Sequence, residues 1–66
     1  MHTISKALGL LDFFTLSRKS WGLSELARTA GHDKATTLRL LRGLMAHAMI
    51  EQDPTTKKYQ LGTAFL

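Results

Sequence analysis

The chain has 66 residues, with nine Lys and Arg against five Asp and Glu, and a formal net charge of +4. This length allows one small domain. The absence of cysteine excludes disulfides and thiolate metal sites, and the three histidines, His2, His32 and His47, lack the spacing of metal ligands. The positive charge and the pI near 10 favour a polyanionic partner, either nucleic acid or an anionic membrane surface.

Neither a membrane span nor a signal peptide is expected from the sequence. No apolar run approaches the roughly 20 residues of a transmembrane helix. The start, Met1-His2-Thr3, lacks the basic and apolar regions of a secretory signal. We therefore expect a soluble, cytoplasmic protein.

The first predicted element is a helix with one buried stripe. Apolar residues recur at helical spacing at Ile4, Ala7, Leu8, Leu11 and Phe14. Thr3 is well placed as its N-cap, and the polar residues 17–20 are predicted to end it.

Two apolar residues of this segment, Leu10 and Phe13, lie off the predicted stripe. They either pack under the predicted wing or join Phe65 and Leu66 in a contact between subunits.

The second predicted helix spans residues 23–30. Its N-cap is either Gly22 or Ser24, and the Gly22 alternative makes Trp21 and Leu26 a hydrophobic staple. Gly31 is predicted to end this helix because glycine readily adopts a positive φ.

The third predicted helix spans residues 34–47, with Asp33 as its N-cap. At about 100° per residue, one side carries Thr37, Leu40, Leu41, Leu44 and Ala48. The opposite side carries Ala35, Leu38, Arg39, Arg42 and Ala46, and it contains no acid. This basic face is the most informative local feature of the sequence.

A β-hairpin is predicted after the third helix. Ile50, Gln52, Tyr59 and Leu61 alternate with polar residues in the period of half-buried strands. Asp53-Pro54 starts a type I turn. The apolar residues 62–66 resemble the opening of a further helix.

Helices 23–30 and 34–47, joined by a short turn that contains glycine, form the helix-turn-helix pattern. With a helix before it and a hairpin after it, the predicted fold class is a mainly α winged helix-turn-helix: three helices plus a two-stranded wing. The start of the second helix of such a motif reaches base edges in the major groove. Cations and short polar groups suit that position, so the predicted DNA-binding residues are Lys34, Ala35, Thr36, Leu38, Arg39, Arg42 and, on the wing, Lys57 and Lys58.

Several stretches of the sequence together resemble the IclR family of bacterial transcriptional regulators. These stretches are Thr3-Ile4-Ser5-Lys6-Ala7-Leu8, Leu23-Ser24-Glu25-Leu26-Ala27-Arg28, Gly31-x-x-Lys34-Ala35-Thr36-Thr37-x-Arg39-Leu40-Leu41 and Tyr59-x-Leu61-Gly62. The chain departs from the family pattern at His32, Asp33, Ala35 and Ala48, where the family usually has Leu, Pro, Ser and Gly. If residue 48 is left-handed, its alanine destabilises the fold by about 1 kcal/mol.

The resemblance implies that residues 1–61 are a DNA-binding domain and that residues 62–66 begin a linker helix to an effector-binding domain. It further implies a dimer or tetramer on an operator, a small-molecule effector bound outside this segment, and regulation that is more often repression than activation. No cofactor is expected. A winged helix that binds a protein or RNA is the alternative. Enzymatic activity is not expected, because the carboxylates are scattered and no nucleophile lies beside a base.

Overall fold

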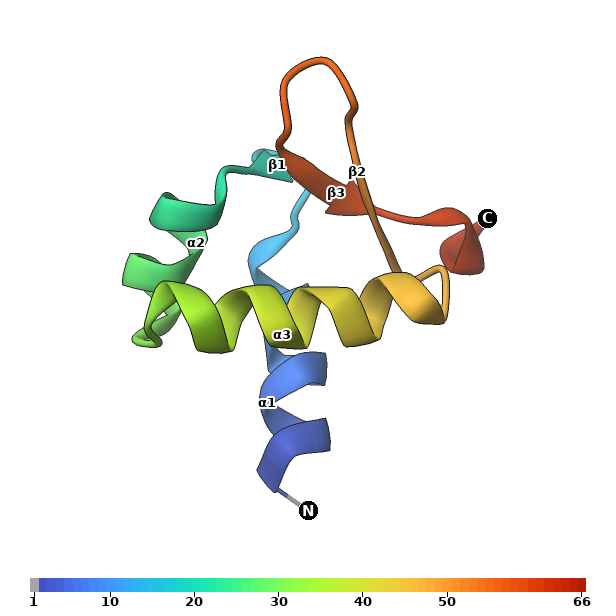
Figure 1. The fold of residues 1–66 in the computed structure, drawn as a ribbon. Helices are drawn as coiled ribbons and strands as arrows, with labels where there is room; N and C mark the ends of the chain where they lie inside the picture. The colour runs from blue at the N-terminus through green and yellow to red at the C-terminus, as the bar shows by residue number, and fades with distance from the viewer. Residues whose placement is uncertain (1) are drawn as a thin grey trace.

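The computed structural model describes residues 2–66, with side chains described from Ile4 onward. Three helices and three short strands follow one another along the chain (Figure 1). They are α1 (His2–Leu10), β1 (Ser20–Trp21), α2 (Leu23–Ala30), α3 (Lys34–Ala46), β2 (Ile50–Gln52) and β3 (Tyr59–Leu61). Two 3₁₀ turns, Leu11–Phe13 and Thr63–Phe65, follow α1 and β3. Thr3, predicted as the N-cap of α1, lies inside the helix instead, because α1 begins at His2; its side chain is outside those described.

The strands form one antiparallel sheet in the order β1-β3-β2. The predicted winged helix-turn-helix is confirmed, and the predicted two-stranded hairpin gains β1 as a third strand. Ser20 pairs with Gln60 and Trp21 with Tyr59. This pairing ties the segment before α2 to the wing, so the wing is held by the body of the domain rather than by its own turn alone.

The predicted buried stripe of α1 is confirmed at Phe14, which is buried, and at Ala7 and Leu11, which are half-buried against the core, but it is wrong at Ile4 and Leu8. The α-helix ends at Leu10 and tightens into the 3₁₀ turn, so the spacing of 100° per residue does not continue to Phe14. Leu10 is 1% exposed and belongs to the core, whereas Ile4 and Leu8 are 50% and 45% exposed. Both exposed residues line an apolar groove between α1 and α3.

Leu10 and Phe13 are therefore part of the fold rather than a free surface for a subunit contact. Leu10 is buried in the core, and half-buried Phe13 packs edge-to-face on Trp21 with ring centroids 5.9 Å apart. The Trp21 indole N–H donates to the Phe13 carbonyl at 2.9 Å. This bond satisfies the polar end of a buried aromatic side chain.

The ends of α2 and the start of α3 agree with the local predictions. Gly22 is the N-cap of α2, and Gly31 ends the helix at φ 79°. The amides of Gly31 and His32 donate back to the last turn of α2, to Arg28 and Ala27, in the pattern of a Schellman motif. The turn to α3 is therefore short, and two of its amides are hydrogen-bonded to the end of α2.

The inner face of α3 was predicted correctly over its length. Thr37, Leu40, Leu41 and Leu44 are buried, and the Thr37 hydroxyl donates to the Asp33 carbonyl at 2.8 Å. Ala48, predicted on the same face, is exposed and lies beyond the helix end, because α3 stops at Ala46.

Ala48 adopts the left-handed conformation at φ 58°. The Ala48 amide donates to Met45 and the Met49 amide to Leu44, both at 3.0 Å, which completes a second Schellman motif. The segment after β3 is bonded to the same turn, because the Ala64 amide donates to the Ala48 carbonyl at 2.8 Å.

A long apolar helix is missing from the described part of the chain: none of its helices has the length and the hydropathy to cross a membrane.

Candidate nucleic-acid interface

The outer face of α3 forms an exposed ridge of Ala35, Arg39, Arg42 and Ala46. Four residues of the opposite face are buried, so the ridge is oriented by the core and cannot rotate inward. The helix contains no acid to neutralise its two arginines. A positively charged helix surface of this kind, with small residues beside the arginines, fits against a polyanion.

The N-terminal end of α3 is organised by Asp33. The Asp33 carboxylate accepts a hydrogen bond from the Thr36 amide at 2.7 Å. The Thr36 side chain and then its amide lower the pKa of Asp33 from its ordinary range, so Asp33 stays ionised as a cap. Lys34 and Ala35 are exposed at this end, whereas Thr36 is half-buried.

Leu38 differs from the other predicted residues of α3. It is half-buried and packs against the core, at the border between the buried face and the ridge. The structure thus brings Ala35, Arg39 and Arg42 onto one exposed face, with Lys34 at its end, and leaves Leu38 at the margin.

The two wing lysines lie on an ordered loop. The Asp53 carboxylate accepts hydrogen bonds from the amides of Thr55 and Thr56 at 2.7 and 3.2 Å. The loop is closed by the Lys57 amide, which donates to the Asp53 carbonyl at 2.8 Å. Lys57 itself is left-handed at φ 66°. Both lysines are exposed, so the loop presents two cations from a fixed backbone.

The wing lysines also face α2. Lys57 and Lys58 line a hollow of about 530 Å³ together with Ser24 and Glu25 of α2. Glu25 pairs with Arg18, whose Nη2 lies 2.8 Å from Glu25 Oε2. The hydrogen bond and the charge of Arg18 lower the pKa of Glu25, so this acid is ionised at neutral pH and already has a partner.

One cation beside the ridge was not among the predicted site residues. Lys6 of α1 is exposed and lines a hollow of about 260 Å³ with Thr36, Arg39 and Leu40. No pattern within α1 identifies it, because its position depends on how α1 packs across α3.

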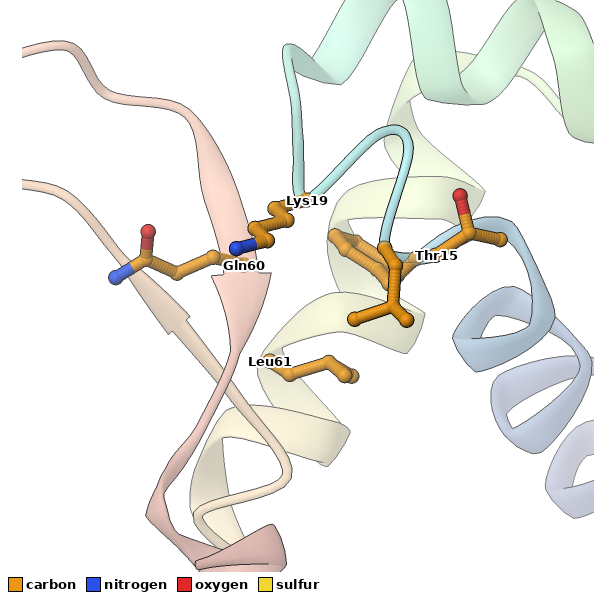
Figure 2. Close-up of a pocket in the computed structure, with 6 residues that line it drawn as sticks. Thr15, Lys19, Gln60 and Leu61 are labelled. Carbon is orange, nitrogen blue, oxygen red and sulfur yellow. The ribbon is translucent and has the colours of Figure 1, made fainter.

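A separate hollow lies on the sheet side of the molecule. Figure 2 shows Lys19 extending toward Gln60 above Leu61, with Thr15 on the other side. No residue of α3 lines this hollow, whose volume is about 530 Å³. Among residues with described side chains, no cluster of His, Asp or Glu has an arrangement that could hold a metal ion.

A three-helix core, a short turn before α3, a wing and an acid-free basic ridge together define a winged helix-turn-helix domain of the nucleic-acid-binding class. Comparison with known families narrows this class. The model of the IclR helix-turn-helix domain matches residues 3–54, and the chain belongs to this family.

The relatives of this chain are transcriptional regulators. It is 33% identical over its 66 residues to the glycerol operon regulatory protein of Streptomyces griseus, covering 26% of that protein. The solved structure of a protein of Silicibacter sp. TM1040, assigned to the IclR regulators, is 41% identical to this chain and superposes with a TM-score of 0.91. The match covers 96% of this chain and 25% of the Silicibacter chain.

A second solved structure, an IclR transcriptional regulator from Alicyclobacillus acidocaldarius, is 27% identical with a TM-score of 0.92 over 100% of this chain and 27% of its own. The chain therefore spans about a quarter of the length of the relatives it matches.

Proposed function

We propose that this domain binds double-stranded DNA in a sequence-specific manner, with α3 in the major groove. The observation that carries the proposal is the exposed ridge of α3, in which Arg39 and Arg42 lie between small residues on a helix without acids. An α-helix fits the major groove, and a guanidinium can pair bidentately with the O6 and N7 atoms of guanine. Arg39, in the first half of the helix, is the proposed base-reading residue.

The remaining cations are assigned to the phosphate backbone. Arg42 lies further along α3, Lys34 lies at its start, and Lys57 and Lys58 lie on the wing. An ammonium group acts as a point charge and suits phosphate better than a base edge. Thr36 and Ala35 approach the DNA with the helix start, and Leu38 contacts it only at the margin of the ridge, where a thymine methyl is the matching group.

For the whole protein we propose a cytoplasmic regulator that acts as a dimer or tetramer and represses transcription. Residues 1–61 would be its DNA-binding domain, residues 62–66 the start of a connection to a further domain, and a small-molecule effector would bind outside this segment. Support comes from relatives about four times as long that are regulators of operons or transcription.

The test is selection of bound duplexes from a random pool, followed by titration of the selected duplex over a salt series. Neutralising phosphates releases counterions, so the four cations assigned to phosphate, at about 0.9 each, predict a slope of log affinity on log salt of about −3.6 per domain. A selected consensus with this slope supports the proposal. A slope near zero would contradict it and favour a protein-binding winged helix, whereas competition by structured RNA better than by duplex DNA would favour an RNA-binding one.

A further inference from the structure

Lys6 of α1 and Arg39 of α3 line the same small hollow, together with Thr36 and Leu40. Its volume, about 260 Å³, is small enough that the two side chains share one space. No acid lines it. Two like charges directed into one hollow repel each other unless an anion lies between them.

Asp33, at the start of α3, does not pair with these two cations. It forms no salt bridge with either of them, because the only ion pair among the described residues joins Arg18 to Glu25. The pKa of Asp33 is lowered mainly by Thr36, and the charge of Arg39 is only a minor cause. The Asp33 carboxylate is instead held by Thr36, through the hydrogen bond to its amide at 2.7 Å. Lys6 and Arg39 are both exposed, so an anion can reach the hollow from solvent.

The position of the hollow relative to the wing indicates which anion it takes. Figure 1 shows α1 leaving α3 on one side and the β2–β3 hairpin standing on the other. A helix in the major groove is flanked by a sugar–phosphate strand on each side. The wing lysines lie toward the strand on one side. On the other side α1 places the exposed cation Lys6 beside α3.

We propose that Lys6 is a phosphate-binding residue of the DNA interface, and that a backbone phosphate of the strand opposite the wing occupies the hollow between Lys6 and Arg39. This inference rests on the proposed DNA-binding function. It adds a contact from α1, outside the helix-turn-helix, and it gives Arg39 a second role, since its charge then also borders a phosphate.

The experiment measures the affinity of the full chain for its selected duplex with Lys6→Gln, Lys6→Arg and Lys19→Gln over a salt series. Loss of one phosphate contact makes the salt slope shallower by about 0.9, which is about an 8-fold weaker affinity at 0.1 M salt if the variants converge at 1 M. Lys6→Gln should show this change on selected and scrambled duplexes alike. Lys6→Arg should retain the wild-type slope because it keeps the charge.

Lys19→Gln is the matched control, because it removes the same charge from an exposed lysine in a hollow that no α3 residue lines (Figure 2). A second measurement uses duplexes in which single phosphates are replaced by neutral methylphosphonates. At one position this replacement should weaken binding by the wild type and by the Lys19→Gln variant, and it should weaken binding by Lys6→Gln less, because only Arg39 then remains beside that phosphate.

The outcomes separate the two proposals. If Lys6→Gln and Lys19→Gln have the same slope while Arg39→Ala loses affinity for the selected duplex, the Lys6 site is refuted and DNA binding stands. If the wild type binds no duplex in a salt-dependent manner, both proposals are refuted. Thermal unfolding of each variant shows whether a loss of DNA affinity comes from a loss of fold stability. The site is supported only if Lys6→Arg also keeps the wild-type salt slope.

Discussion

The left-handed turn at the end of α3 offers a test in which the same side-chain change has opposite effects at two positions. Ala48 lies at φ 58°, where the Cβ of an L-residue crowds the backbone and destabilises the conformation by about 1–2 kcal/mol. Glycine removes this strain but increases the entropy of the unfolded chain, which lowers stability by about 0.4–1 kcal/mol. The net expectation for Ala48→Gly is a gain of roughly 0.5–1 kcal/mol in the free energy of unfolding.

Ala46 provides the comparison. It is the last residue of α3 and is exposed, as is Ala48, so neither methyl group contributes much buried area. In helical conformation alanine has no strain to lose, and Ala46→Gly should destabilise by up to about 1 kcal/mol.

Thermal unfolding followed by circular dichroism measures both effects. For a domain of this size, 1 kcal/mol shifts Tm by about 4–8 °C. Ala48→Gly should therefore raise Tm by about 2–8 °C, and Ala46→Gly should lower it by up to a similar amount. If Ala48→Gly lowers Tm as much as Ala46→Gly does, the left-handed strain is not present in solution and the reasoning fails.

Three further predictions concern the exit of the chain, the α2 ion pair and the DNA surface. A Cβ at Gly62 would clash with the Ala48 carbonyl oxygen, whereas one at Gly43 meets nothing within 4 Å. Gly62→Ala should therefore lower Tm through overpacking, and Gly43→Ala, inside a helix, should raise it. The arginine partner of Glu25 lowers the pKa of this carboxyl from its ordinary 4.5. The ion pair therefore stabilises the fold above that pH, and this contribution is lost as the pH falls through the lowered pKa. The Tm difference between wild type and Glu25→Gln should be largest near pH 7 and vanish in acid. Arg39→Ala should weaken binding to the selected duplex by about 1–3 kcal/mol and relax the base preference at one position. Lys57→Ala should weaken binding to selected and scrambled duplexes alike and make the salt slope shallower by about one. Equal losses on both duplexes for Arg39→Ala would assign this residue to the DNA backbone only.

Features fixed by chemistry within a few residues could be predicted from the sequence. The cap at Asp33, the left-handed Gly31 and the buried face of α3 depend on neighbours in the chain and on the helical period. The exposed ridge followed from the same period, because α3 is long enough for its two faces to separate.

Features fixed by packing could not be predicted in this way. Part of the α1 stripe was misplaced: Leu10 rather than Ile4 and Leu8 enters the core, and the helix ends there because the chain tightens into a 3₁₀ turn. Strand β1 has two residues and forms only by pairing with β3, which is distant in sequence. The same holds for Lys6, whose place beside Arg39 depends on the crossing of α1 and α3.

The two left-handed residues other than glycine show how strain is distributed around the wing. Ala48 precedes β2 and Lys57 precedes β3, each by two residues. At Lys57 the conformation belongs to the loop that carries the charge: its amide donates to Asp53, and its carbonyl accepts from the Gln52 side chain at 2.9 Å. At Ala48 the strained residue carries no group that the proposed interface uses. Relieving the strain there should therefore change stability and leave DNA affinity as it is, which distinguishes a residue that supports the fold from one that presents a contact.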